Sequence, residues 1–278
     1  MCPNCRAFIS SDDRACPYCE MQLGPRAIER RSPSNVAGLI PGTQFVTSLI
    51  LLINIGLFIA TMVYSAKGTH GLSMDVDGQT LILFGAKWAP LIVFGGEWWR
   101  LVTAGFLHGG VIHILMNSWV LFGLGAQVEQ LYGTARMIVF YFLATVGGFL
   151  ASLYISPRSL SIGASAGIFG LIGVMIAFGM QHRSEIGAAI RSHYMQWAIY
   201  GIAMGLLPGF RVDNAAHIGG LAAGFAIGYL AGVPKAYRTA QDIFWRAAAG
   251  LSILLTALSF LLMFLRFLAA TQGTPAVQ

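Results

Sequence analysis

The chain has 278 residues, of which 56% are hydrophobic and 10% are charged, whereas about a quarter of the residues in soluble domains carry a charge. Its mean hydropathy of +0.69 therefore excludes an ordinary soluble enzyme and predicts that most of the chain lies in lipid. The formal net charge of +6 does not indicate a nucleic-acid partner, because the basic residues are spread among loops rather than clustered with aromatic residues.

The first nineteen residues contain all four cysteines, arranged as two Cys-Pro-x-Cys pairs, and no apolar run that would indicate a cleaved signal peptide. Four thiolates on two such turns complete a tetrahedral Zn²⁺ shell, and the metal supplies the folding energy that so small a module lacks. A redox pair or disulfides are the alternative. We expect a structural zinc-ribbon-like module over residues 1–24 and a basic linker over 25–43. The expected ligands are Cys2, Cys5, Cys16 and Cys19.

Seven apolar runs are long enough to cross a bilayer, since a membrane span needs about 20 residues. The connection between the first two, about 67–100, is amphipathic and ends in Trp98-Trp99-Arg100, a composition that suits the headgroup zone. The predicted fold is an all-α polytopic membrane protein. The expected spans are 44–66, 101–124, 136–155, 162–181, 194–210, 214–232 and 247–269.

Basic residues predict how these spans are oriented. With the N-terminus inside, 11 of the 17 Lys and Arg residues fall in inner segments, as the positive-inside rule requires. We therefore expect a multi-pass protein of the cell membrane with a cytoplasmic N-terminus and an outer C-terminus. The cysteine module then lies in a reducing compartment, where thiols stay available for a metal.

Several polar residues interrupt the apolar runs at one predicted depth. Ser165 opens the fourth span, His217 opens the sixth, and His108, His113 and Asn117 lie in the second. In the predicted orientation all of them lie in the outer half of the bilayer. A lone serine in a membrane helix usually bonds to its own backbone, but buried polar groups on three segments are costly unless they meet one another. The pattern predicts a shared site.

A serine and a histidine at one depth have the composition of a hydrolase site. A neutral imidazole can take the proton of a serine hydroxyl, so His217 is the candidate base for Ser165. No acidic residue lies within a turn of His217 except Asp213, expected in a surface loop, which predicts a dyad. The Ser165 backbone N–H, at a helix N-terminus, and the side chains of His113 and Asn117 are the expected oxyanion donors.

Glycines recur every four residues after His217, at Gly220, Gly224 and Gly228. Such a stripe lets helix backbones approach closely, which would bring the histidine against a neighbouring helix. The glycines near Ser165 lie mostly away from it on an ideal helix, so we expect them to pack on a different helix and make no claim of a single glycine-to-glycine contact. They are Gly163, Gly167 and Gly170.

Taken together, these residues resemble the rhomboid family of intramembrane serine proteases over about residues 88–232. The resemblance covers Ser165 and His217, although Ala166 follows the serine where the commonest family form has glycine. The motifs are Gly163-Ala164-Ser165, Ala216-His217-Ile218-Gly219-Gly220, His108-x4-His113-x3-Asn117 and Trp99-Arg100.

The resemblance implies a six-helix core over 44–232 and an additional seventh helix within 233–278. It implies that Ser165 is the nucleophile and His217 its base, and that Phe169 packs on the base. His113 and Asn117 stabilise the oxyanion in the family. The implied supporting residues are His108, Gly163, Phe169, Gly220, Trp99 and Arg100.

The expected activity is cleavage of single-span membrane proteins near the outer face of the bilayer, with zinc confined to the N-terminal module and no cofactor for catalysis. The expected partners are membrane-protein substrates, the lipid bilayer and a cytosolic protein that binds the zinc ribbon. The alternatives are a catalytically silent protein that binds membrane helices and, less in keeping with the pattern, a transporter with midplane histidines. Glu129 is expected to make a structural hydrogen bond. The seventh span is expected to be an anchor or a packing element, with Ser252, Thr256 and Ser259 bonded to their own backbone.

Overall fold

The computed structural model describes residues 5, 15–21, 44–69, 73–207, 212–233 and 240–272. Within these ranges the chain forms helices and no strand, and isolated β-bridges join Asp75 with Gly110 and Lys87 with Ser161. The chain divides into two compact units, Met1–Gly42 and Thr43–Gln278. The helices found among the described residues all belong to the second unit.

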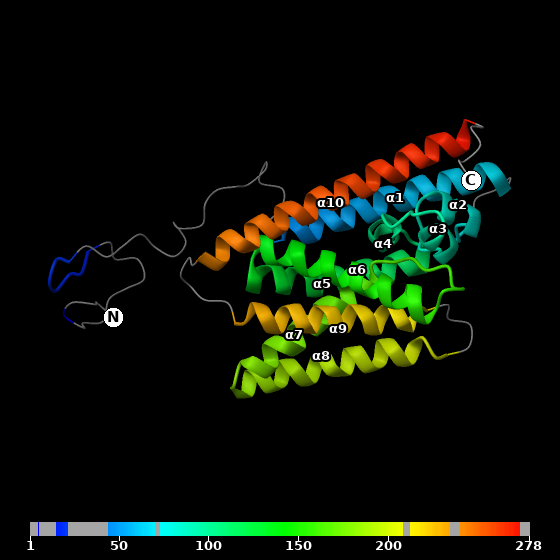
Figure 1. Cartoon of the computed structure of the whole chain (residues 1–278). Coiled ribbons are helices and arrows are strands. Elements are labelled where there is room, and N and C mark those ends of the chain that lie inside the picture. The colour runs from blue at the N-terminus through cyan, green and yellow to red at the C-terminus, as the bar shows by residue number, and fades with distance from the viewer. Residues whose placement is uncertain are drawn as a thin grey trace. The chain divides into compact units, whose positions relative to one another are not determined.

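Seven long helices make up this second unit (Figure 1). Four of them, α1, α5, α6 and α10, are long and apolar enough to cross a membrane, and α7 is a shorter apolar helix. The predicted all-α polytopic membrane fold is confirmed. The helices are α1 (Phe45–Thr69), α5 (Val111–Tyr132), α6 (Thr134–Ile155), α7 (Ser165–Gln181), α8 (Glu185–Met204), α9 (Asn214–Ala231) and α10 (Ala240–Thr271).

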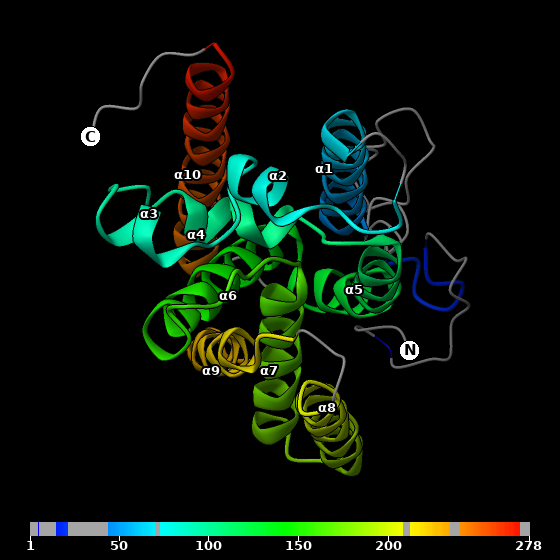
Figure 2. The ribbon, with the colours of Figure 1, turned by 90° about the vertical axis from the view of Figure 1, so that its right-hand side faces the viewer.

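Helix α7 lies at the centre, with α5, α6, α8 and α9 around it (Figure 2). Every residue from Ala166 to Gly179 is buried. Helices α7 and α9 pack in parallel, because a Cβ atom added at Gly220 would meet the Ala166 carbonyl and one added at Gly224 would meet Gly170. The first residue of α7 is therefore level with the second turn of α9, which begins at Asn214.

The expectation that the glycines near Ser165 pack on a helix other than α9 is wrong for Gly170. Gly170 of α7 lies against Gly220 and Gly224 of α9, where a side chain on any of these residues would meet the backbone of the other helix. Gly167 does face a different helix, because an added Cβ there would lie 2.6 Å from the Tyr141 ring of α6. An ideal-helix projection separates these two faces correctly but does not identify which neighbour each one meets.

Three predicted spans have different bounds in the structure. The second begins at Val111 instead of residue 101, because residues 100–106 form the short helices α4 (Arg100–Thr103) and η1 (Ala104–Phe106) before it. The fifth begins at Glu185 instead of 194, because the Ser184 hydroxyl caps it by accepting from the Gly187 N–H at 3.1 Å. The seventh, α10, extends beyond its predicted bounds of 247–269 at both ends.

The long connection after α1 folds into short helices and is more than an amphipathic loop. Helices α2 (Gly78–Leu83), α3 (Ala89–Val93) and α4 follow one another there. We call residues 73–106 the connecting segment. Arg100 of this segment is buried within the protein, and it donates to Glu97 at 2.6 Å. Glu97 also pairs with Arg266 of α10 at 2.8 Å, so α10 makes a polar contact that its description as an anchor did not include.

Two structural expectations are confirmed. The Glu129 carboxylate of α5 accepts from the backbone N–H groups of Val46 and Thr47 at 2.9 and 3.0 Å, which ties α5 to the start of α1. These are N–H groups that the first turn of a helix leaves without an intrahelical partner. The α10 hydroxyls bond to carbonyls four residues earlier in their own helix; they belong to Ser252, Thr256 and Ser259.

Candidate active site

Ser165 is the first residue of α7, and the backbone two residues before it has a conformation that requires glycine. Gly163 has a φ of +123°, which a side chain would strain, and its N–H donates to the Ala104 carbonyl at 2.9 Å. Ser165 is half-buried. Its backbone N–H belongs to the first turn of α7, where N–H groups are not used within the helix and the helix dipole is positive.

His217 lies in the first turn of α9, in register with the start of α7. Its ring stacks on Phe169 with centroids 4.0 Å apart and planes 14° apart. Phe169 lies four residues after Ser165, and residues at this spacing share a helix face. The buried His217 ring therefore lies against the face of α7 that also carries Ser165.

Asp213 is not the loop residue that the sequence predicts, since it caps α9. Its Oδ1 accepts from the Ala216 N–H at 3.1 Å, its Oδ2 accepts from the Ser152 hydroxyl of α6, and its carbonyl accepts from the His217 N–H at 3.1 Å. Among the described residues, the Nδ1 atom of His217 has no hydrogen-bond partner. Asp213 therefore fixes the helix turn that carries His217 without a hydrogen bond to the ring.

His113 of α5 faces the approach to Ser165. The Gly109 N–H donates to its Nδ1 at 3.4 Å, so a neutral ring carries its proton on Nε2. A Cβ atom added at Gly163 would lie 2.8 Å from that Nε2 and 3.6 Å from the Ser165 Oγ. The Nε2–H of His113 is thus directed to the space beside the serine hydroxyl.

Asn117 and His108 stand on either side of His113. The buried Asn117 side chain donates from Nδ2 to the His113 carbonyl at 3.0 Å, one turn earlier in α5. His108 precedes α5 instead of lying within the second span as predicted, because the chain is extended at Leu107 and enters the helix only after Gly110. The His108 ring is fully buried and meets the His113 ring edge-on at 5.1 Å.

The predicted site residues separate into two groups in space. The Arg100 guanidinium lies over the Trp99 ring, 4.6 Å from its centroid, and donates to the carbonyls of Ile82 and Ala86. Trp99 and Arg100 form one group, which holds the connecting segment together. The other group lies around the start of α7 and consists of Ser165, His217, Phe169, His113, Asn117, His108, Gly163 and Gly220.

The sequence interpretation missed three residues next to this site. Ser152 was not distinguished from other small residues of an apolar run, and Asp213 was assigned to a loop. Lys87 is fully buried and lies in the α2–α3 connection. The available signal was its position as a lone charge between Leu81 and Val93 in an otherwise uncharged stretch.

In the first unit, three of the four predicted zinc ligands lie together. The Sγ atoms of Cys5, Cys16 and Cys19 are all within 4.8 Å of one another, and those of Cys5 and Cys16 are 3.6 Å apart. Thiolates around one tetrahedral Zn²⁺, each about 2.3 Å from the metal, are separated by about 3.8 Å. The three thiols therefore fit a zinc shell. The fourth predicted ligand, Cys2, lies outside the described residues.

Comparison with known proteins agrees with this arrangement. Residues 95–234 match a family model described as a Rhomboid domain. "Rhomboid protease GluP" of Bacillus subtilis (strain 168) is 37% identical over 158 residues, which are 57% of this chain and 31% of that protein. "Rhomboid-like protease 3" of Toxoplasma gondii is 34% identical over 56% of this chain and 59% of that protein. "Rhomboid-like protease 2" of the same organism is 31% identical over 203 residues, which are 68% of this chain and 67% of that protein. The chain thus spans 31% and 59% of the length of the first two.

Proposed function

The chain belongs to the rhomboid family, and on this premise we propose that it is an intramembrane serine endopeptidase whose catalytic dyad is Ser165 and His217. One observation carries the proposal. The His217 ring stacks on Phe169, one turn after Ser165 on the same helix face. This contact supports a dyad, because proton transfer from a serine hydroxyl requires an imidazole on the neighbouring surface.

In the proposed reaction the Ser165 Oγ attacks the scissile carbonyl while His217 takes its proton. The charge that develops on the carbonyl oxygen is met by the Ser165 backbone N–H, the Nε2–H of His113 and the Asn117 amide. His217 then protonates the leaving amine, and water completes hydrolysis of the acyl-enzyme. No step requires a metal or cofactor.

The proposed substrates are single-span membrane proteins that are cut near the outer face of the bilayer. A helix hides its carbonyls in hydrogen bonds, so a protease needs a stretch that unwinds at helix-breaking or small residues. In the proposed topology, with a cytoplasmic N-terminus in the plasma membrane, the N-terminal ends of α5, α7 and α9 face outward. The alternative is a rhomboid-like protein that binds membrane helices without cleaving them.

Purified protein in detergent is expected to cleave a generic single-span substrate at one position near its outer end. Mass spectrometry of both products gives that position, and labelling of Ser165 by a fluorophosphonate reports a reactive serine independently of any substrate. No cleavage and no labelling would favour the binding protein. Cleavage at the cytoplasmic end would refute the proposed topology.

We also propose that the N-terminal module binds one structural Zn²⁺ through Cys2, Cys5, Cys16 and Cys19 and presents a surface to a cytosolic partner. When bound, the metal would supply folding energy to a module too small for its own core. A metal acts as a Lewis acid only by direct coordination of the reacting oxygen. We propose no catalytic role for the zinc, because in the proposed topology its ligands are cytoplasmic and Ser165 faces outward.

Deletion of residues 1–24 is therefore expected to release all bound zinc while cleavage in detergent stays near that of the full chain. Metal analysis and the cleavage assay measure the two effects on one preparation. Zinc retained by the deletion would refute the ligand assignment. A folded deletion variant without activity would show that the module contributes to catalysis.

A further inference from the structure

Lys87 is a fully buried lysine beside the proposed active site. From the connection between α2 and α3, its Nζ donates to the carbonyls of Ser156 and Ser159 at 2.7 and 3.1 Å, and the Ser159 Oγ is 3.4 Å away. An ammonium group without water is costly unless oxygen atoms replace its hydration. These contacts indicate that the lysine has a specific task at this turn.

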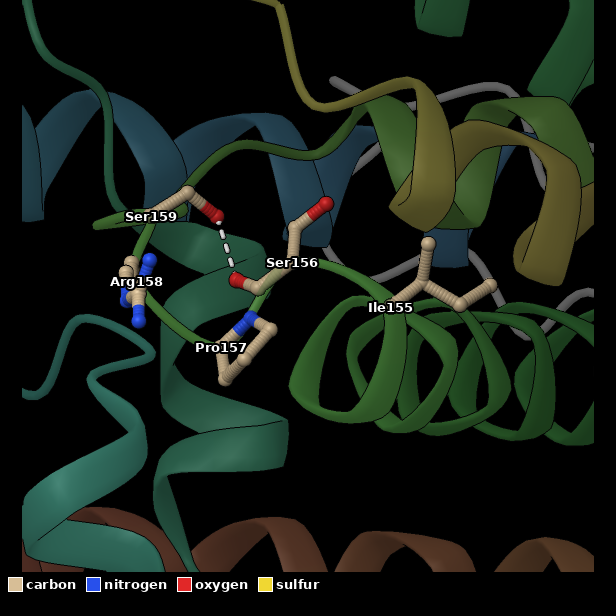
Figure 3. Close-up of a pocket in the computed structure, with 5 residues that line it drawn as sticks. All are labelled: Ile155, Ser156, Pro157, Arg158 and Ser159. Carbon is tan, nitrogen blue, oxygen red and sulfur yellow. Dashed lines mark hydrogen bonds between the residues drawn. The ribbon is translucent and has the colours of Figure 1, made fainter.

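The turn that Lys87 holds directly follows α6 (Figure 3). Its Ser159 hydroxyl donates to the Ser156 carbonyl at 2.8 Å, and the Ser159 N–H donates to the same oxygen at 3.1 Å. The Ser156 carbonyl therefore gathers three donors, of which Lys87 is the charged one. A cation at the C-terminal end of α6 is also favoured by the helix dipole.

From this turn the chain leads to the nucleophile over a few residues, and Lys87 holds it again on the way. The backbone groups of Lys87 and Ser161 exchange two hydrogen bonds of 3.0 and 3.1 Å. Two residues later the Gly163 N–H donates to Ala104, and Ser165 begins α7. The position of Ser165 thus follows from contacts that Lys87 makes through both its side chain and its backbone.

The second polar neighbour of Lys87 is the segment that carries the base. Asp213 caps α9 one turn before His217, and Ser152 of α6 donates to its carboxylate. Burial lowers the pKa of the Lys87 ammonium, and attraction to the Asp213 carboxylate opposes that effect. Lys87 contacts Ser156 and Asp213 contacts Ser152, so both groups lie at the C-terminal end of α6.

We propose that Lys87 is a positioning residue for the dyad, holding the 156–163 connection that delivers Ser165 at the end of α6 that also contacts Asp213, the cap of the helix that carries His217. It touches neither substrate nor the reacting atoms. This inference rests on the proposed function, because it assigns the role through Ser165 and His217.

Replacement Lys87→Met keeps the length of the side chain and removes its charge and donors. We expect kcat to fall about 10- to 100-fold with little change in KM, since displacement of a catalytic group by about 1 Å costs on the order of 100-fold in rate. The rate of fluorophosphonate labelling per competent site should fall in parallel. The labelling end point gives the fraction of competent sites, so a loss of folded protein alone would lower the end point and leave the per-site rate unchanged.

Three further variants accompany this measurement. Lys87→Arg keeps a charged donor and is expected to recover most of the per-site rate. Lys87→Gln keeps a neutral donor and is expected to have a reduced per-site labelling rate. This variant provides the test if Lys87→Met does not fold. The matched control is Lys67→Met, the same change at an exposed lysine in the last turn of α1, which should behave as wild type.

The outcomes separate the inference from its premise. If wild-type protein neither cleaves nor labels at Ser165, the proposed function is wrong. If wild type is active and the Lys87→Gln or Lys87→Met protein labels at the wild-type rate per competent site, the positioning role is wrong and the proposed function stands.

Discussion

Replacement of Ser165 by alanine, or of His217 by alanine, is expected to reduce cleavage of a single-span substrate to the uncatalysed background. The first change removes the hydroxyl that attacks the carbonyl, and the second removes the base that makes this hydroxyl nucleophilic. Residues that act as a unit have strongly non-additive effects. The double variant should therefore be no slower than either single variant, as measured by product formation over long incubations.

Two further variants test whether this loss is specific. Asn117→Ala should lower the rate by about 10- to 1000-fold without abolishing it, as loss of one oxyanion donor does. Ser252→Ala removes a hydroxyl that bonds to the Ala248 carbonyl within α10, far along the chain from the site, and should leave the rate unchanged. Substantial activity in folded Ser165→Ala protein would refute the nucleophile assignment, and full activity in Asn117→Ala would remove Asn117 from the site.

Hydropathy predicts the number of long helices well and their first residues less well. The apolar run from Leu101 includes Gly105, Gly109 and Gly110, and there the chain forms a 3₁₀ turn and an extended approach before α5 begins. Hydropathy cannot detect such a change of backbone conformation. Helix α8 shows the opposite error, because its first turns contain Glu185 and Arg191 and fall outside an apolar window although they are helical.

The candidate site could be predicted where a side chain itself carries the chemistry. A serine at a helix start and a histidine heading a glycine stripe are visible in the sequence, and so is their common predicted depth. The buried charge of Lys87 was not recognised, because a lone lysine in a connection usually faces solvent. Its burial depends on carbonyl groups of Ser156 and Ser159, some seventy residues later. Every residue has a backbone carbonyl, so the sequence does not indicate which one will accept a hydrogen bond.

The packing of α7 on α9 was the other feature that the sequence did not resolve. Glycines at four-residue spacing on α9, and at three-residue spacing from Gly167 to Gly173 on α7, indicate close packing, but the periodicity alone does not say which helix each stripe meets. In the structure Gly170 and Gly224 meet directly. This contact fixes the level of His217 relative to Ser165, so the geometry of the proposed dyad depends on glycine at positions 170 and 224.

Replacement Gly224→Val is accordingly expected to inactivate the protein although it touches neither Ser165 nor His217. A Cβ atom at this position would meet the backbone of Gly170, which cannot move aside as a flexible side chain could. Helices α7 and α9 must then separate, and a shift of about 1 Å between nucleophile and base costs on the order of 100-fold in rate. Overpacking should also lower the free energy of unfolding by about 1–3 kcal/mol.

The matched control for this change is Gly250→Val in α10, another helical glycine, where an added Cβ would have no neighbouring atom within 4 Å. Cleavage rate, labelling rate per competent site and thermal stability in detergent are measured for both variants. Gly250→Val should match wild type in all three, which separates the steric effect from that of a β-branched residue in a helix. Wild-type cleavage by Gly224→Val would mean that α7 and α9 do not approach as closely as described. A normal per-site labelling rate with fewer competent sites would mean that the contact supports folding and does not set the geometry of the dyad.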